Sequence, residues 1–199
     1  MIQGSDIAVL GAWQNFYILI GTAAATLTGL MFVATTLVAG LDSHTSTLHA
    51  GLSAFSSPTV VHFCAVLLLA GILSAPWQAY AALAFVLGLL GLAMVLYLIG
   101  VMRQMRKVPD YRTPLKDWLW YMALPFSAYV AVTAAAFVLP ANPALALYIV
   151  SAAMLALLFL GIHNAWDLVT YLAIQRSHSE NKTTEQTHSS SGRRHNRPH

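Results

Sequence analysis

The chain has 199 residues, of which 10 are Lys or Arg and 7 are Asp or Glu, whereas 58% are apolar or aromatic. Soluble domains carry about a quarter charged residues, so this composition excludes an ordinary soluble protein. The net charge of +3 comes from one internal segment and the C-terminal tail. We interpret this basicity as a topology signal rather than as a surface for nucleic acid.

Charged residues are missing from three long stretches of the sequence, namely Asp6 to Asp42, Asp42 to Arg103, and Asp117 to Asp167. Each stretch is long enough for at least one helix to cross a bilayer, which takes roughly 20 residues. The apolar runs are continuous, whereas the strands of a membrane barrel would alternate. The sequence therefore predicts an all-α integral membrane protein, a polytopic helix bundle.

Five transmembrane helices are predicted, and in chain order they cover residues 13–40, 59–75, 77–102, 118–139, and 143 to beyond 163. Prolines stand at several of the predicted boundaries, where proline is tolerated. Pro125 instead lies inside the fourth span, so we expect a kink there. Residues 1–175 form one transmembrane domain in this prediction, and residues 176–199 form a disordered polar cytoplasmic tail.

The orientation follows from the lysines and arginines, which favour the cytoplasmic side of a membrane. Five of them lie between the third and fourth spans and five in the tail: Arg103, Arg106, Lys107, Arg112 and Lys116, then Arg176, Lys182, Arg193, Arg194 and Arg197. With five spans, both basic segments fall inside and the N-terminus falls outside. We expect this orientation in a plasma membrane, such as the bacterial inner membrane.

The first span carries a stripe of small and polar residues along its length. Two neighbouring columns recur every seven residues, with Ala25 on the same stripe: Gln14, Gly21, Thr28 and Thr35, then Asn15, Thr22, Gly29 and Thr36. Small residues let helix backbones approach closely, and hydroxyls bond across helices. A polar lining is equally what a conducting path needs. The stripe is therefore predicted to be a helix-packing face or a pore lining, and spacing alone does not separate the two.

A second group of polar residues is predicted at the cytoplasmic end. His163, Asn164 and Asp167 share one face of the fifth span, and His62 lies about one turn into the second span from the same side. His163 and Asp167 are one turn apart, so they could share a proton or hold one cation. Ionisable groups at membrane depth are usually functional. We predict a ligand or ion site here, against the alternative of a wetted helix end.

The sequence contains no HExxH, CxxC, Walker A or GxSxG motif. It therefore indicates no catalytic residue and identifies no metal or cofactor, which favours a protein that is not an enzyme. His62 and His163 are the histidines within the spans that could ligate haem. They keep an intramembrane haem or redox subunit open as a further alternative.

The leading functional hypothesis is a small oligomeric, channel-like or transport-related membrane protein. Its polar first-helix stripe would line the path or the subunit interface, and the inner polar group would act as a gate, cation site or proton acceptor. The main alternative is a non-catalytic accessory or sensor subunit whose stripe packs against another membrane protein. The expected partners are thus the lipid bilayer, further copies of the chain, or a membrane-protein partner.

Overall fold

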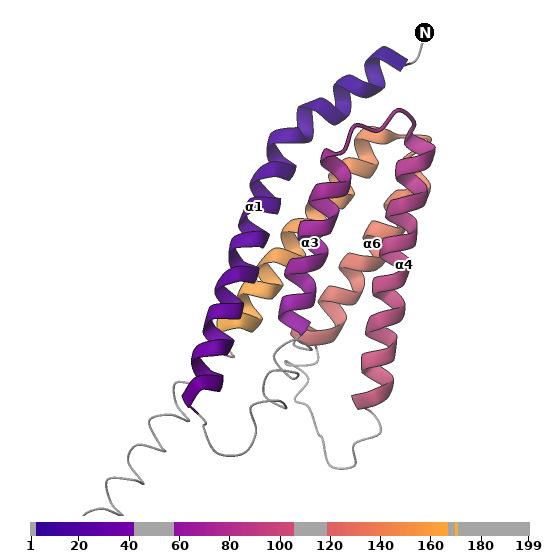
Figure 1. Cartoon of the computed structure of the whole chain (residues 1–199). Helices are drawn as coiled ribbons and strands as arrows, with labels where there is room; N and C mark the ends of the chain where they lie inside the picture. The colour runs from indigo at the N-terminus through magenta and orange to yellow at the C-terminus, as the bar shows by residue number, and fades with distance from the viewer. Residues whose placement is uncertain (1–2, 42–57, 106–118, 167–169, 171–199) are drawn as a thin grey trace, which may run out of the picture. The chain divides into compact units, whose positions relative to one another are not determined.

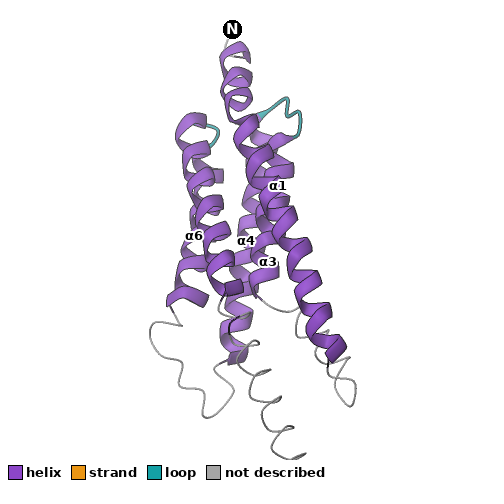
Figure 2. Ribbon diagram, turned by 90° about the vertical axis from the view of Figure 1, so that its left-hand side faces the viewer, coloured by secondary structure: helices purple, strands orange, loops and turns teal. Residues whose placement is uncertain are grey.

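A computed structural model describes residues 3–41, 58–105, 119–166 and 170. These residues are almost entirely helical, and no strand occurs among them (Figure 2). The chain divides into two compact units, Met1–Asn164 and Ala165–His199. The helix contacts reported below all lie within the first unit. The predicted tail, residues 176–199, and the predicted site residue Asp167 lie outside the described residues.

Helix α1 spans Gln3–Leu41 and contains 39 residues without a proline. It begins about ten residues before the predicted span. At 1.5 Å per residue it is roughly 60 Å long, about twice the thickness of a bilayer core. The part that is apolar enough to cross a membrane is Leu10–Ala34, so α1 extends beyond the membrane.

Helix α3 covers Pro58–Ser74, 17 residues. Proline suits its first turn, because the N–H that proline lacks would have no partner within the helix. A short turn then leads to α4, Tyr80–Met105. In this turn the Trp77 amide donates to the carbonyl of Ala75 at 2.9 Å. The Trp77 indole N–H donates to the carbonyl of Ile72, which pairs one of the carbonyls that a helix end leaves open.

The fourth predicted span consists of a π-helical turn, η1 at Leu119–Ala123, followed by α6 at Leu124–Val138. Pro125 lies in the first turn of α6. Its ring would collide with the carbonyl one turn earlier in a regular helix, and it offers no N–H. The distortion that the sequence predicts at this proline therefore takes the form of a wider, π-helical turn.

The last helix runs over Pro143–Trp166 and is the orange helix of Figure 1. The turn before it is held at both sides by hydrogen bonds. The Leu139 amide caps the end of α6 by donating to the Ala135 carbonyl at 2.9 Å. The Asn142 side-chain oxygen then accepts a hydrogen bond from the Leu145 amide at 3.1 Å. An asparagine in this position pairs one of the N–H groups that a helix start leaves open.

Successive helices of the first unit alternate in direction (Figure 1). Helix α1 packs along α3, and α4 packs along α6, whereas α3 touches α4 only lightly. The end of α1, the start of α3, the end of α4 and the start of η1 lie at the lower end of the unit in Figure 1. The two predicted histidines, near the start of α3 and the end of the last helix, belong to this same end.

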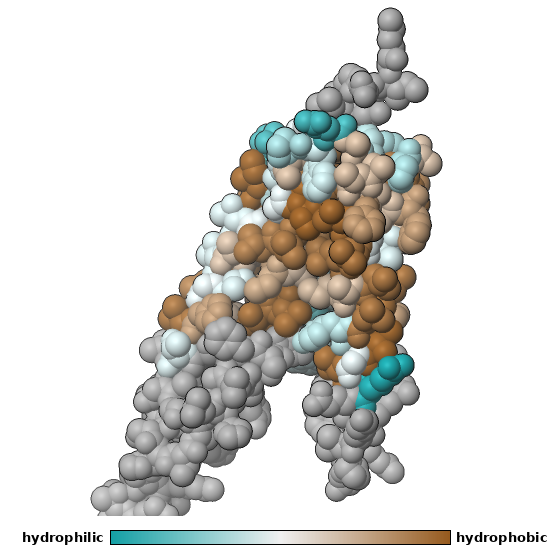
Figure 3. All heavy atoms as spheres, turned by 45° about the vertical axis from the view of Figure 1, so that its right-hand side comes forward, coloured by the Kyte–Doolittle hydropathy of each residue, from teal (hydrophilic) through white to brown (hydrophobic). Residues whose placement is uncertain are grey.

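Four helices have the length and composition to cross a membrane, within Leu10–Ala34, Tyr80–Arg103, Leu119–Val138 and Pro143–Trp166. Large apolar side chains cover much of their surface, and Phe85 and Phe137 are 72% and 81% exposed. On the face drawn in Figure 3, hydrophobic residues gather between two more hydrophilic ends. Monomeric soluble proteins rarely expose so many large apolar side chains together. The chain is therefore a multi-pass helical membrane protein.

Candidate functional site

The glycines of the predicted α1 stripe face in different directions. A Cβ atom added to Gly21 would lie 2.8 Å from the Cβ atom of Ala70 on α3. Gly29 is exposed, and an added Cβ would meet no atom within 4 Å. Each helical residue advances about 100°, so two residues eight positions apart differ by about 80° around the axis. The small-residue pattern therefore serves a contact with α3 at one glycine and points away from the bundle at the other.

Most of the stripe points away from the bundle, and we call this exposed set the outward face of α1: Gln14, Asn15, Thr22, Ala25, Gly29 and Thr36. Thr28 is half-buried, and the side chain of Thr35 lies outside the described residues. Large apolar residues flank this face, since Leu19 and Leu30 are each more than half exposed. Ile18, Phe32 and Val33 are exposed on this same face, one turn from its small and polar residues, so the face mixes small, polar and apolar side chains.

The threonine hydroxyls of this face are bonded within α1 itself. Thr22 donates to the carbonyl of Ile18 at 2.7 Å, and Thr36 donates to the carbonyl of Val33 at 2.9 Å. A threonine bonded in this way leaves no donor without a partner in an apolar setting. The carboxamides of Gln14 and Asn15 are different, because each has two donors and an acceptor to satisfy. They lie toward the N-terminal end of the apolar part of α1.

The outward face of α4 gives a clear contrast. Its large exposed residues are all apolar, namely Phe85, Leu89, Leu92 and Leu96, and Ala93 and Gly100 are exposed beside them. Such a surface matches lipid chains, whereas a small and polar surface packs poorly against them and suits another helix. Helix α1 thus exposes hydroxyl and carboxamide side chains among its apolar residues, whereas the exposed face of α4 carries leucine and phenylalanine with small residues between them.

His62 lies inside the bundle rather than at its surface. Its side chain is fully buried, and its Nδ1 atom lies 2.8 Å from the hydroxyl of Tyr129 on α6, which is 1% exposed. The Nε2 atom of His62 has no hydrogen-bond partner among the described residues. A neutral imidazole has one donor and one acceptor, so Tyr129 satisfies one ring nitrogen and leaves the other open.

The other members of the predicted inner site have different surroundings. The His163 ring lies against Trp120, with 4.2 Å between the ring centroids. Asn164 is 1% exposed, and neither its Oδ1 nor its Nδ2 has a hydrogen-bond partner in the described part of the chain. Among the described residues, His62 is therefore paired with Tyr129, and the His163 ring packs against Trp120. A site shared with Asp167 stays a prediction, because that residue is not described.

Sequence reasoning missed two buried tyrosines. Tyr129 is the partner of His62, and Tyr17 of α1 turns its fully buried side chain toward Ser151 of the last helix. The Tyr17 and Ser151 hydroxyls lie near each other, but neither forms a hydrogen bond of normal geometry with a described residue. The available signal was a tyrosine deep in an apolar span, because a buried tyrosine hydroxyl usually has a partner.

The described residues include no group of three or more His, Cys, Asp or Glu side chains that could hold a metal ion. His62 and Asn164 are buried and each carries a hydrogen-bonding atom without a partner among the described residues, whereas His163 is half-buried. No known protein family, curated protein or solved structure matches the chain. Two features of the molecule remain as functional evidence, namely the outward face of α1 and the buried polar side chains of His62 and Asn164.

Proposed function

We propose that the protein is a small oligomeric, channel-like or transport-related membrane protein whose subunits meet through the outward face of α1. The observation that carries this proposal is the contrast between helices. Helix α1 exposes Asn15, Thr22 and Gly29 between Ile18 and Val33, whereas α4 exposes phenylalanine and leucines without a hydroxyl or carboxamide among them. Copies of α1 arranged about a symmetry axis would remove this face from lipid.

The chemistry of the face suits both close packing and a polar path. Gly29 has open space around it, so the backbone of a second helix could approach there. Because Thr22 and Thr36 are bonded within α1, they add polarity without needing a partner. Gln14 and Asn15 would meet water or each other near one membrane surface. A path along the axis would then have a polar lining of the kind that conduction requires.

The proposal includes five spans, with the N-terminus outside and the C-terminus in the cytoplasm. Helix α3 is apolar and 17 residues long, which is at the lower limit for a span. The alternating helix directions in Figure 1 support an odd number of crossings. Reporter fusions at the two ends test this arrangement. The N-terminal fusion should report an outside location and the C-terminal fusion a cytoplasmic one, whereas two ends on one side would exclude five spans.

The oligomer is tested by mass measurement of purified protein in lipid nanodiscs. The wild-type chain should form a homo-oligomer. Gly29→Leu should weaken association by roughly tenfold or more, because a large side chain separates the facing backbones. Gly100→Leu on α4 is the matched control, since Gly100 is also exposed with nothing within 4 Å of an added Cβ. A wild-type monomer, or equal effects of the two variants, would overturn the proposal.

Ion or proton flux into liposomes separates the leading function from its alternative. An oligomer that conducts, and loses conduction in Gly29→Leu, supports a path at the α1 contact. An oligomer or monomer without flux favours the accessory or sensor subunit, whose outward α1 face would pack against another membrane protein. In the channel-like function, the inner polar groups His62 and Asn164 are candidates for a gate, cation site or proton acceptor. Their burial and open hydrogen-bonding atoms support that role.

A further inference from the structure

Polar side chains other than tyrosine are buried at four described positions, and three of these positions lie near the inner end of the bundle. They are Thr59 and His62 near the start of α3, and Asn164 near the end of the last helix. Ser151 is the fourth, and the 13 residues between it and Asn164 correspond to about 20 Å along the helix axis. A buried polar group is costly unless it is hydrogen-bonded, so each side chain of this cluster needs a partner.

The buried faces of α3 and the last helix meet at Phe63 and Gly161. A Cβ atom added to Gly161 would collide with the Phe63 ring. His62 directly precedes Phe63, and Asn164 lies three residues beyond Gly161 on the same face of the last helix. The two helices run in opposite directions (Figure 1). His62 and Asn164 therefore lie at the same inner end of one helix interface.

The hydrogen-bonding atoms of His62 and Asn164 are only partly paired. The Nδ1 atom of His62 lies 2.8 Å from the Tyr129 hydroxyl, but its Nε2 atom has no partner among the described residues. The same holds for both Oδ1 and Nδ2 of Asn164. A carboxamide oxygen accepts, a carboxamide nitrogen donates, and an imidazole nitrogen does either, depending on the tautomer. A ligand that pairs these atoms must both donate and accept hydrogen bonds.

Water meets this requirement better than a cation does. A buried water molecule typically makes about three hydrogen bonds to polar groups that are otherwise unpaired. A cation needs several oxygen ligands, about six to eight for calcium, whereas the unpaired atoms of His62 and Asn164 include one oxygen. The acidic residue in the described part of the chain is Asp6, near the start of α1 at the opposite end of the unit (Figure 1).

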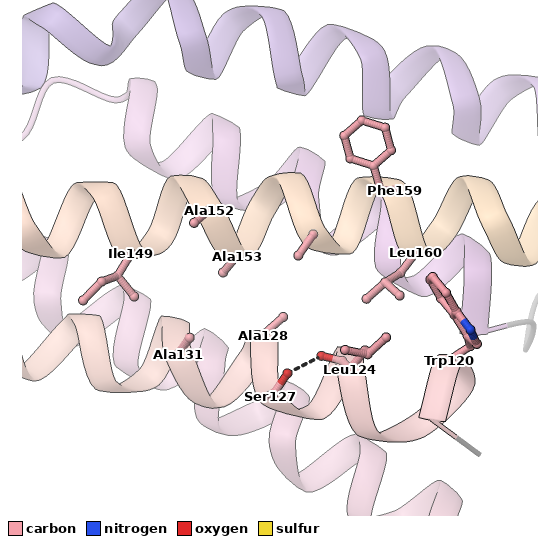
Figure 4. Close-up of a pocket in the computed structure, with 11 residues that line it drawn as sticks. Trp120, Leu124, Ser127, Ala128, Ala131, Ile149, Ala152, Ala153, Phe159 and Leu160 are labelled. Atoms are coloured by element: carbon pink, nitrogen blue, oxygen red, sulfur yellow. Dashed lines mark hydrogen bonds between the residues drawn. The ribbon is translucent and has the colours of Figure 1, made fainter. Parts of the chain in front are cut away.

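The groove between α6 and the last helix shows that space alone does not make a water site. Its volume is about 510 Å³, and its lining is mostly alanine and larger apolar residues such as Leu160. Ser127 is the lining residue with a hydroxyl, which donates to the Leu124 carbonyl at 2.8 Å within its own helix (Figure 4). Apolar cavities stay dry. The unpaired polar atoms instead belong to the interface with α3.

We propose that water molecules bind at the inner end of the interface between α3 and the last helix, where they connect the His62 Nε2 atom with the Asn164 carboxamide. They enter from the inner membrane surface, where both helices have their described ends. Bound water allows a fully buried imidazole to exchange protons with that surface. The inference rests on the proposed function for any role in gating or proton transfer, whereas water binding itself needs neither an oligomer nor ion flux.

Water-edited solid-state NMR of the full chain in lipid bilayers, with ¹⁵N-labelled histidine, tests this site. The His62 ring signals are identified by their loss in His62→Gln. In the wild type, magnetisation should pass from water to this ring although the side chain is fully buried. In Asn164→Leu the transfer rate should fall at least about threefold, because leucine removes hydrogen-bond partners of the water. Ser151→Ala is the matched control, because Ser151 is a buried, unpaired residue of the same helix, and it should keep the wild-type rate.

Circular dichroism establishes that the variants are folded, and Asn164→Val takes the place of Asn164→Leu if the leucine variant does not fold. Absence of transfer to His62 in the wild type would overturn the inference, because the ring would then be dry or bonded directly to another side chain. Equal rates in the wild type and Asn164→Leu would also overturn it, as would an equal loss in Ser151→Ala. A monomeric or non-conducting protein would contradict the proposed function and leave these rates unchanged.

Discussion

Helices α1 and α4 resemble each other on their inner sides and differ on their outer sides. Each has one glycine pressed against its neighbour: Gly21 meets Ala70 of α3, and Gly91 meets Thr133 of α6. Each also has an exposed glycine with open space, Gly29 on α1 and Gly100 on α4. Helix packing inside the subunit therefore follows the same rule in both cases, in which a missing side chain allows close approach.

The outer sides of the two helices differ in the residues around the exposed glycine. Around Gly100, α4 exposes Leu92 and Leu96, whereas around Gly29, α1 exposes Thr22 and Ala25 on one side and Phe32 and Val33 on the other. A glycine by itself thus carries little information about its environment. The residues one turn away on the same face decide whether that face suits lipid chains or another helix.

The contact between α4 and α6 at Gly91 should give the largest effect on stability. A Cβ atom added to Gly91 would lie 3.0 Å from the backbone nitrogen of Thr133 and 2.5 Å from its Oγ1 atom. Backbone cannot move aside as a flexible side chain can, so we expect Gly91→Ala to lower the free energy of unfolding by roughly 1–3 kcal/mol. Thermal or detergent-induced unfolding of the purified protein measures this change.

Gly88→Ala is the matched control on the same helix. An added Cβ there lies 3.5 Å from the Cβ atom of Ala136, an ordinary van der Waals distance. This variant should keep wild-type stability or gain slightly, because alanine is a better helix former than glycine. If Gly91→Ala were as stable as Gly88→Ala, the α4–α6 contact at Gly91 would not be as close as the structure has it.

The outer faces are compared by cysteine cross-linking, which should give the next largest difference. Cys64 is exposed, so it is first replaced by alanine. In that background, Gly29→Cys should form an intermolecular disulfide under mild oxidation, because two α1 faces in close contact bring Cα atoms within disulfide reach. Gly100→Cys should not. Cross-linking of both cysteines to similar extents would indicate random collision and remove the distinction between the two faces.

The sequence was sufficient for much of the fold. Gaps between charges such as Asp117 and Asp167 predicted long apolar helices, and Pro58 and Pro143 marked the starts of two of them. These features depend on local chemistry and on the bilayer, so they can be read without a structure. The predicted start of the first span at residue 13 lies within three residues of the apolar stretch that begins at Leu10. That the helix itself already begins at Gln3 could not be predicted, because helical residues before the span leave no apolar signature.

The direction in which each face points could not be read from the sequence. The sequence pattern places Gly21 and Gly29 on the same stripe. They differ by about 80° around the helix axis, so Gly21 faces α3 and Gly29 faces outward. The pairing of His62 with Tyr129 could not be predicted either, because these residues are 67 positions apart in the sequence. Long-range contacts of this kind depend on how helices pack, which periodicity within one helix does not determine.

The smallest expected effect compares two buried tyrosines, Tyr17 on α1 and Tyr129 on α6. Tyr129→Phe removes the hydrogen-bond partner of the His62 Nδ1 atom and leaves both nitrogens of a buried imidazole unpaired within the described residues. Hydrogen bonds between membrane helices contribute about 0.6 kcal/mol on average and about 1.7 kcal/mol at most. We therefore expect Tyr129→Phe to destabilise the fold by an amount in that range.

Tyr17→Phe should change stability less, although its side chain is equally buried. The Tyr17 hydroxyl forms no hydrogen bond of normal geometry among the described residues, so its removal breaks none and relieves the cost of burying an unpaired polar group. The same unfolding assay as for Gly91→Ala compares the two phenylalanine variants. A greater loss in Tyr17→Phe would mean that the Tyr17 and Ser151 hydroxyls are joined in the membrane, directly or through water. The closest polar link of α1 to the bundle would then be its contact with the last helix.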